Sequence, residues 1–278
     1  MAVCLCDLLV TRDFTEELKQ TVTWQVADYE SNIFRFWSTE EIKRMLGARK
    51  PQAVNTASIA STEQSDSLPE NFDSREKWGA CVHEVRNQGN CGSCWAFAAT
   101  NQLADRFCIN KKDVILSPQY VIECDRYDDC CDGGDLDTSF RFLVETGTVE
   151  DHCLAYDKNC GRCREVNCPH FKCKEGSVFT STDNEKTKHE MFSNGPMEAA
   201  FDVYRDFLYY NGGVYQHKSG EYLGGHAIEI LGWGKEAGLD YWLCKNSWGA
   251  SWGMNGYFKI KMGDCDIDNN MITCAPLI

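Results

Sequence analysis

Seventeen cysteines among 278 residues constrain this chain more than any other feature of its sequence. Fifteen of them lie between Cys81 and Cys274. This density is far above intracellular usage and predicts a region held together by disulfides in an exported protein. A zinc protein is the alternative, but most cysteine pairs here have no second pair at a matching spacing. The odd total means that at least one thiol stays unpaired.

Charge and hydropathy exclude several classes of partner. The chain carries 42 acidic against 28 basic side chains, a net charge of −14, which disfavours attraction to nucleic acid or anionic membrane. It contains no run of about 18 apolar residues, so we expect no membrane span. Met1 to Val10 is short and interrupted by Asp7, so it resembles at most the remnant of a secretory signal.

The chain divides into stretches of different character. Residues 11–50 contain no cysteine and read as helical. The first helix is indicated by apolar residues at helical spacing, Phe14, Leu18, Val22 and Val26, and a second, short helix is expected at Glu40 to Leu46. Ala53 to Ser67 has the composition of a mobile linker. Beyond Leu68 the first part reads as helical, notably Cys94 to Ile109.

The last hundred residues have the pattern of antiparallel strands. Short apolar or alternating runs punctuated by glycine occur at Ala227 to Leu231, Tyr241 to Cys244 and Tyr257 to Ile260. A helical half and a sheet half imply a cleft between them, where enzyme sites tend to lie.

The most specific motif is Cys-Gly-Ser-Cys-Trp at residues 91–95, a signature of cysteine-protease active sites. Cys94 stands where a Gly-Ser turn meets the predicted helix, so the helix dipole and free amides favour its thiolate. Three other interpretations compete: a Cys91/Cys94 redox pair, half of a zinc site, or structural cysteines. The redox pair requires a preceding strand, whereas Val82 to Gln88 is polar and charged.

A nucleophilic thiol needs a base, and one of the six histidines has suitable surroundings. His226 follows two glycines and opens an apolar strand, where packing can fix the imidazole ring. Asn246, in Lys-Asn-Ser-Trp-Gly, offers a carbonyl that can orient this ring, and Trp248 could cover the bond between them. His226 and Asn246 lie 132 and 152 residues beyond Cys94, close to the spacing expected of such proteases.

Over nearly its whole length the chain resembles papain-family cysteine proteases of the cathepsin B type. Besides the active-site motif, the matching segments are Trp24, Lys43–Gly47, Asp105–Ile109, Asn194–Glu198, Asp206–Tyr210, Gly213–His217 and Gly224–Gly234. The resemblance implies an α+β, two-lobed papain-like fold with a helical left lobe, an antiparallel β-barrel-like right lobe and an N-terminal helical prosegment. Residues 1–66 would be remnant signal, inhibitory prosegment and linker, and residues 67–278 the peptidase domain.

The same resemblance assigns roles around the catalytic residues. Gln88 would donate to the oxyanion, and the substrate strand would bond to the backbone of Gly133 and Gly134. Other substrate-binding residues would be Trp248 and four that form the pocket for the second substrate residue before the scissile bond: Leu136, Ala200, Ala227 and, at its base, Asn270. Cathepsin B would have glutamate at that base, so we expect weaker acceptance of arginine here, unless Asp135 or Asp268 compensates.

The implied reaction is peptide hydrolysis through an acyl-enzyme at Cys94, with no metal or organic cofactor. Cathepsin B also carries a long loop with two adjacent histidines that confers release of C-terminal dipeptides. The segment Cys153 to Cys173 is short and has no such pair, so we expect an endopeptidase. The implied setting is a monomeric zymogen in a lysosome-like acidic vesicle or secreted, with protein and peptide substrates, its own prosegment as inhibitor, and cystatin-type inhibitors as further partners.

Four disulfides are also implied by the resemblance: Cys81–Cys108, Cys91–Cys131, Cys124–Cys168 and Cys153–Cys173. Cys160 and Cys163 are expected either to pair locally or to form a metal or redox site. The pairing of Cys130, Cys244, Cys265 and Cys274 stays open, since sequence does not determine connectivity. Two alternative functions remain at this point: a thiol-disulfide oxidoreductase using Cys91 and Cys94, and a non-catalytic peptide-binding homologue.

Overall fold

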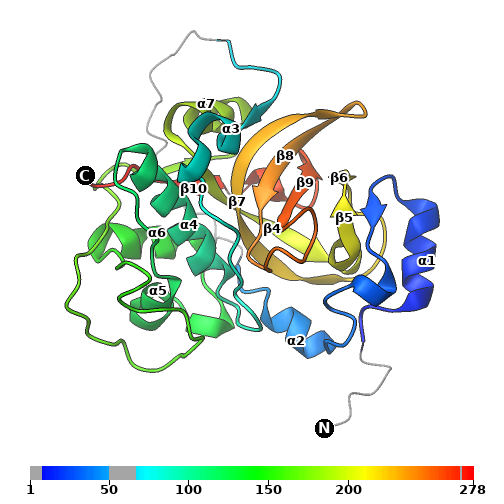
Figure 1. Ribbon diagram of the computed structural model, residues 1–278, viewed down its shortest axis with the longest axis horizontal. Helices are drawn as coiled ribbons and strands as arrows, with labels where there is room; N and C mark the ends of the chain where they lie inside the picture. The colour runs from blue at the N-terminus through cyan, green and yellow to red at the C-terminus, as the bar shows by residue number, and fades with distance from the viewer. Residues whose placement is uncertain (1–7, 50–66, 270) are drawn as a thin grey trace.

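The computed structural model describes residues 8–49, 67–269 and 271–278. Most of the predicted N-terminal remnant, nearly all of the predicted linker and Asn270 lie outside these residues. The described chain forms two lobes joined along a central helix, with an N-terminal segment lying across them (Figure 1). This arrangement confirms the predicted α+β two-lobed class.

The helical lobe, residues 79–178, is built on α4 (Cys94–Ile109), the predicted helix with its predicted bounds. All residues of α4 from Cys94 to Cys108 are buried, because the helix lies between α5 (Pro118–Cys124), α6 (Leu136–Glu145) and the sheet. A helix that is buried all round needs apolar and small residues on every face, which Ala96, Ala98 and Ala99 supply. Short 3-10 helices η3 (Gly79–Cys81) and η4 (Cys130–Asp132) complete this lobe.

The sheet lobe, residues 179–273, contains a sheet of eight strands. Seven follow the order β3-β10-β4-β7-β8-β9-β6, and β2 (Phe72–Asp73) also pairs with β7. The three predicted strand runs are confirmed within β7, β8 and β9. The bounds are β3 (Phe179–Ser181), β4 (Met197–Tyr204), β6 (Val214–Tyr215), β7 (Tyr222–Glu236), β8 (Leu239–Lys245), β9 (Tyr257–Lys261) and β10 (Met271–Thr273).

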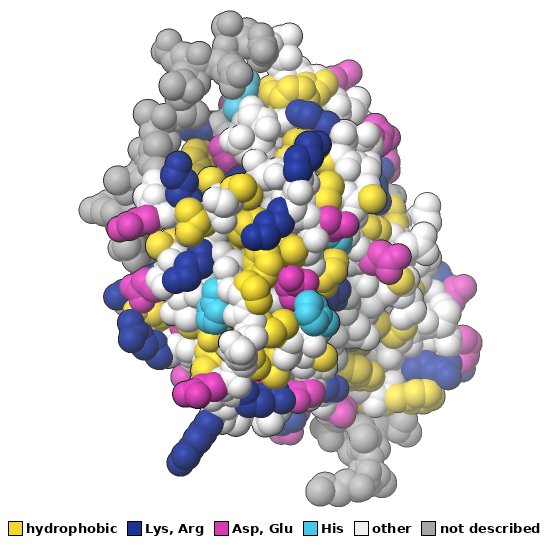
Figure 2. Space-filling view, turned by 60° about the vertical axis from the view of Figure 1, so that its left-hand side comes forward, with side chains coloured by type: hydrophobic (Ala, Val, Ile, Leu, Met, Phe, Trp, Pro, Cys, Tyr) yellow, Lys and Arg dark blue, Asp and Glu magenta, His cyan; other side chains and the backbone are white. Residues whose placement is uncertain are grey.

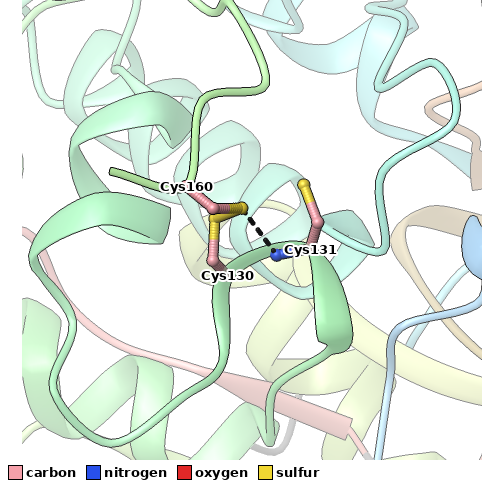
Figure 3. Close-up of side chains that lie close together, drawn as sticks. All are labelled: Cys130, Cys131 and Cys160. Carbon is pink, nitrogen blue, oxygen red and sulfur yellow. Dashed lines mark hydrogen bonds between the residues drawn. A yellow bond between two sulfur atoms is a disulfide. The ribbon is translucent and has the colours of Figure 1, made fainter. Parts of the chain in front are cut away.

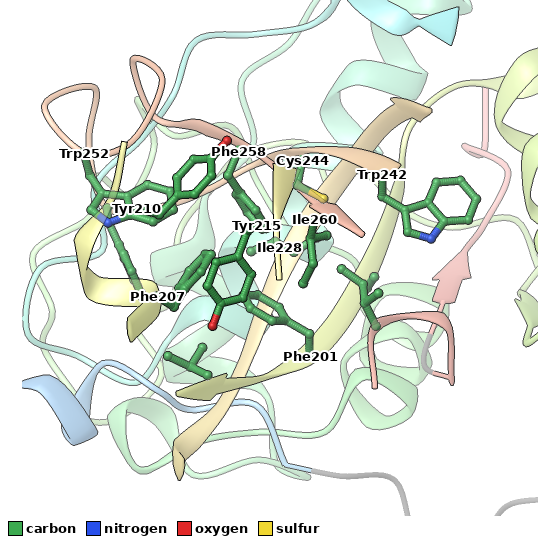
Figure 4. Packing of buried hydrophobic residues seen from close by; sticks show 14 of the residues in the cluster. Phe201, Phe207, Tyr210, Tyr215, Ile228, Trp242, Cys244, Trp252, Phe258 and Ile260 are labelled. Carbon is green, nitrogen blue, oxygen red and sulfur yellow. The ribbon is translucent and has the colours of Figure 1, made fainter. Parts of the chain in front are cut away.

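Two details differ from the expected antiparallel barrel. The strand order of the described residues is an open path rather than a closed ring, and β6 pairs with β9 in parallel. The lobe is completed by β5 (Tyr210–Gly212) and by the helices α3 (Ser74–Trp78), α7 (Asn184–Asn194), η5 (Arg205–Tyr209) and η6 (Ile267–Asn269). Its core is largely aromatic: Phe207 packs within 5.1 Å, centroid to centroid, of Phe201, Tyr215, Trp252 and Phe258 (Figure 4).

The N-terminal segment folds against the sheet lobe. Its helices are α1 (Arg12–Thr21), η2 (Tyr29–Ser31) and α2 (Thr39–Arg44), and Ser38 forms a capping box with Glu41. Val26, expected to continue the first helix, instead lies in β1 (Gln25–Val26), because this strand pairs with β5. The Trp24 indole donates to the carbonyl oxygen of Gln216 at 3.0 Å.

The described residues form six disulfides, and two of the four implied pairings are wrong. Cys81 is joined to Cys108 and Cys91 to Cys131, as the resemblance implied. Cys124, implied to pair with Cys168, is joined to Cys163, and Cys153, implied to pair with Cys173, is joined to Cys168. The remaining pairs are Cys130–Cys160 and Cys173–Cys274.

The physical reason for these differences lies in the fold of the loops. Phe171 and Thr148 pair by backbone hydrogen bonds, and Cys173 forms a bridge with Pro276, so Cys173 is held beside the C-terminus and away from Cys153. Cys160 and Cys163 have separate partners and neither pair with each other nor form a redox couple. Figure 3 shows the Cys130–Cys160 bond beside Cys131, whose backbone N–H donates to Cys160 Sγ at 3.3 Å.

The molecular surface mixes charges of both signs. On the face shown in Figure 2, Lys and Arg side chains alternate with Asp and Glu, so the excess of negative charge does not gather there. Among the described helices, not one combines the length and apolar character needed to cross a membrane.

Candidate active site

Cys94 is the first residue of α4, at the boundary between the two lobes. The Ser93 side chain makes no cap, and the Trp95 N–H bonds to the sulfur, whereas the N–H groups of Ala96 and Phe97 donate to the Ser93 carbonyl. Burial nevertheless raises the pKa of the thiol to about 11, against smaller opposite effects of the N–H groups of Ala227, Gly47 and Trp95. The expected thiolate is therefore disfavoured here, because the N-terminal segment covers the sulfur.

His226 and Asn246 meet at the adjoining edge of the sheet lobe. His226 lies on β7 and Asn246 directly follows β8, and the imidazole Nε2 is 2.7 Å from Asn246 Oδ1. His226 Nδ1 has no partner among the described residues, which leaves it available to a reacting group. The Trp248 ring lies 4.8 Å from the imidazole, centroid to centroid. Complete burial lowers the pKa of His226 to about 4.

Gln88, the residue expected to donate to the oxyanion, is buried and bonds to the N-terminal segment. Its side-chain amide donates to the carbonyl oxygen of Met45 at 2.8 Å, so a carbonyl of the N-terminal segment lies where a substrate carbonyl could. Ser247 holds Gln88 in place by donating to its side-chain oxygen at 2.6 Å and accepting from its backbone N–H at 2.9 Å. Asn246 Oδ1 also accepts from the N–H of Ser247 at 2.8 Å.

Ser247 and Tyr156 are positioning residues that the sequence analysis missed. Tyr156 donates to the carbonyl of Gln88 at 2.9 Å and lies 2.7 Å from the Ser93 hydroxyl, so it supports both sides of the nucleophile. Ser247 could have been suspected because it is adjacent to Asn246 in a motif. Tyr156 lies in an irregular loop, and its surroundings give no comparable sequence signal.

Residues 45–49 run through the cleft between the lobes. Gly134 donates to Gly47 O at 2.9 Å and accepts from Arg49 N at 3.0 Å, while Ala48 donates to Gly225 O at 3.1 Å. This pattern is a parallel bridge between Ala48 and Gly134. The approach is so close that a Cβ on Gly47 would lie 1.9 Å from the carbonyl oxygen of Gly92. Gly133 lies beside Gly47 on the same wall.

The proposed pocket residues lie together beneath this segment. Leu136, Ala200 and Ala227 are buried in one apolar cluster, which also contains Ala48. Asp268, considered as a possible charge for this pocket, instead accepts from the Trp242 indole at 2.7 Å and from Asn184. A buried carboxyl that the sequence analysis did not single out, Glu198, lies on the same strand as Ala200.

The groups that could hold a metal do not fit one. Within the described chain, the cluster of Cys130, Cys131 and Cys160 consists of disulfide sulfurs, which are not thiolate ligands. The other cluster, His83 with Cys108 and Asp113, also depends on a disulfide cysteine.

Comparisons with known proteins agree with this geometry. Residues 68–275 match the family described as "Papain family cysteine protease". The chain is 41% identical over 241 residues to cathepsin B-like CP3 of Giardia intestinalis, covering 81% of this chain and 79% of that protein. It is 36% identical to a gut-specific cysteine proteinase of Caenorhabditis elegans, covering 98% and 96%. The solved structure of proCathepsin B S9 from Trypanosoma congolense superimposes with a TM-score of 0.88 at 29% identity, covering 97% and 99%.

Proposed function

The chain belongs to the papain family of cysteine proteases, and we propose that Cys94, His226 and Asn246 carry out its peptide hydrolysis. The observation that carries this assignment is the placement of the Met45 carbonyl. It accepts from Gln88 in the cleft that holds the free thiol and the His226–Asn246 pair. A substrate carbonyl in that position would be polarised beside the nucleophile.

The reaction then proceeds in two steps. Cys94 transfers its proton to His226 Nδ1 and its sulfur attacks the carbonyl carbon, while Gln88 stabilises the oxyanion. His226 protonates the leaving amine, and water releases the acyl group with His226 as base. Asn246 Oδ1 accepts from Nε2–H and fixes the ring, which leaves Nδ1 free to exchange a proton with the sulfur. The residues require no metal or organic cofactor for these steps.

Endopeptidase action is supported by the loop between Cys153 and Cys173. This segment contains only one histidine, His170, whose Nδ1 bonds to the carbonyl of Thr146. The nearby His152 lies 3.3 Å from Glu150. Neither forms the adjacent pair that would bind a C-terminal carboxylate, so we infer cleavage inside chains.

We assign residues 1–66 to an inhibitory prosegment and linker and residues 67–278 to the peptidase domain. The contacts of residues 47–49 in the cleft support the inhibitory role, since they would exclude substrate. Six disulfides support export, and we propose a lysosome-like vesicle or secretion as the destination.

Two alternative functions have less support. An oxidoreductase using Cys91 and Cys94 is not favoured, because Cys91 is bonded to Cys131. A non-catalytic binding protein would not need the free Cys94.

The test is active-site titration of the enzyme after removal of the prosegment. An epoxide peptide inhibitor should label Cys94 with unit stoichiometry and abolish cleavage of a peptide blocked at both ends. Cys94→Ala should be inactive, whereas Cys265→Ala, which removes a partly exposed free thiol, should remain active. Labelling of another cysteine, or activity in Cys94→Ala, would refute the assignment.

A further inference from the structure

We propose that Lys158 is a specificity-determining residue that favours substrates with an acidic side chain at one of the first two positions after the scissile bond. The inference rests on the proposed function, because it assigns a preference to the cleft described above. Its evidence is the position of the Lys158 ammonium beside Gly89 and the loop that holds it there.

The backbone that leads to Cys94 links the two ends of the cleft. At one end Asn87 forms an antiparallel bridge with Trp248. At the other end the Gly92 N–H donates to the carbonyl oxygen of Cys131 at 3.0 Å. This backbone therefore spans the cleft, with Trp248 at one end and the wall of paired glycines at the other.

The two ends receive different parts of the substrate. Under the proposed function, Gly133–Gly134 bind the part that precedes the scissile bond, so the part that leaves as the amine extends toward Trp248. Gly89 lies at the Trp248 end, because its N–H donates to Asn87 Oδ1 at 2.9 Å. It directly follows Gln88, the proposed oxyanion donor. A side chain placed over Gly89 is therefore beside the leaving part of the substrate.

The ammonium of Lys158 lies over Gly89. A Cβ on Gly89 would be 3.2 Å from Lys158 Nζ and 3.3 Å from its Cδ, so the absence of a side chain leaves room for the lysine. Lys158 is exposed and forms no ion pair among the residues that the structure describes. The adjacent Asp157 does not neutralise it, since that carboxylate lies 3.0 Å from Arg164. The cation is thus available to a substrate carboxylate.

The loop that carries Lys158 is fixed on both sides of this residue. The Tyr156 hydroxyl donates to the carbonyl oxygen of Gln88 at 2.9 Å, and Cys160 is tied to η4 by its disulfide. The buried Gln119 side chain accepts from the Lys158 N–H at 3.1 Å. Lys158 also has a φ of 64°, a conformation that a non-glycine residue keeps only where its surroundings impose it. The side chain therefore starts from a defined point beside the oxyanion donor.

This geometry limits the substrate positions that the ammonium can reach. Gly89 is one residue from the proposed oxyanion donor, and consecutive Cα atoms are about 3.8 Å apart, so the nearest substrate residues are the first two after the scissile bond. Side-chain direction alternates along an extended chain, so only one of these two positions should face Lys158. A carboxylate there pairs with the ammonium, whereas a lysine is repelled.

The experiment uses peptides amidated at the C-terminus, in which the varied side chain supplies the only carboxylate. They carry Glu, Gln or Lys at the first or the second position after the cut and are assayed at low salt and about pH 6, where glutamate is ionised. Because Lys158 is exposed, we expect kcat/KM for the Glu peptide to exceed that for the Gln peptide by about two- to fivefold at one of the positions. The Lys peptide should be the poorest substrate, and added salt should reduce the ratio.

Substitution of Lys158 separates charge recognition from support of the loop. In Lys158→Gln the Glu-to-Gln ratio should fall to about one, whereas Lys158→Arg, which keeps the charge, should retain it. Lys111→Gln is the matched control and should keep the wild-type ratio. Lys111 is also an exposed lysine with a positive φ, 72°, but it lies beyond the opposite end of α4 from Cys94.

Two results would overturn the inference while peptide cleavage continued. One is a wild-type enzyme with no preference for Glu over Gln at either position. The other is a fall of kcat/KM by the same factor for all peptides in Lys158→Gln, with an unchanged ratio, which would show that Lys158 only supports the loop. Failure of an enzyme with titratable Cys94 to cleave any of the peptides would instead contradict the proposed function.

Discussion

The two lobes maintain their folds by different means. In the part of the chain that the structure describes, twelve cysteines form disulfides, and all of them lie in the helical lobe except Cys274, which ties that lobe to the end of β10. The sheet lobe contains two described cysteines, Cys244 and Cys265, and both are free. Residues 146–178 of the helical lobe have no helix and no strand, so covalent links replace the missing backbone ladders. A sheet with an aromatic core does not require them.

The active site combines the two. Of the residues proposed to be catalytic, Cys94 and Gln88 come from the helical lobe and His226 and Asn246 from the sheet lobe, so the proposed reaction depends on how the lobes are docked. A buried ion cluster fixes that docking: Lys245 Nζ lies 3.2 Å from Asp105 on α4 and 2.7 Å from Glu229 on β7.

The largest loss of stability should follow from removing the disulfide that closes the longest loop. Replacing both Cys173 and Cys274, 101 residues apart, by serine should lower the free energy of unfolding by about 4 to 5 kcal/mol, since the unfolded chain regains loop entropy. Urea unfolding measures the change. Cys265→Ser, the free-thiol control, should have little effect. An equal loss in both variants would contradict the view that the helical lobe depends on its disulfides.

A slightly smaller loss of stability is expected from a substitution in the core of the sheet lobe. Phe207→Ala removes a buried ring that contacts Phe201, Trp252 and Phe258 and should cost about 3 to 5 kcal/mol. Ile115→Ala, at a hydrophobic side chain that is 42% exposed, is the control and should cost less than about 1 kcal/mol. Thermal unfolding measures the difference. Phe207→Ala should melt at a lower temperature than Ile115→Ala even under reducing conditions, where the disulfides no longer contribute.

The free energy of unfolding should fall in acid because of His226, which lies at the boundary between the lobes. The folded pKa of His226 is about 4 against 6.5 for the free side chain, so the unfolded chain binds the extra proton first. Stability from the neutral imidazole is present above pH 6.5 and is lost as the pH falls toward 4, on the order of 3 kcal/mol.

The measurement uses Cys94→Ser, which should not process itself. Its melting temperature at pH 8 and pH 4.5 is compared with that of the double variant that also carries His226→Gln. The double variant should lose less stability on acidification. An identical loss would show that other groups cause the acid response.

The smallest of these effects concerns the contact of the prosegment with the sheet lobe. Phe34 is buried and its ring lies 5.2 Å from Trp248, centroid to centroid, whereas Phe36 is 65% exposed. Phe34→Ala in a separately added prosegment should weaken inhibition of the mature enzyme by about 2 kcal/mol or more, roughly thirtyfold. Phe36→Ala should leave the inhibition constant nearly unchanged, and equal effects would contradict this contact.

Much of the candidate site could be selected from the sequence because its signals are local. The Cys-Gly-Ser-Cys-Trp motif precedes an apolar helical pattern, and His226 and Asn246 lie beside strand-like runs, so Cys94, His226, Asn246 and Gln88 could be selected together. The disulfides could not be deduced in full, because each cysteine has many possible partners and chain path decides among them. Tyr156 reaches Gln88 across 68 residues, which no local pattern indicates.

The sequence by itself determined the family, the candidates for the reacting groups and the position of α4 and the main strands, since these depend on local pattern and spacing. Tertiary structure decided which cysteines bond, that Val26 joins a strand and that Met45 meets Gln88. It also reversed the expected ionisation of Cys94: a helix N-terminus favours the thiolate, but burial beneath the prosegment outweighs it. Burial depends on what packs above the sulfur, and that is set by residues far away in the chain.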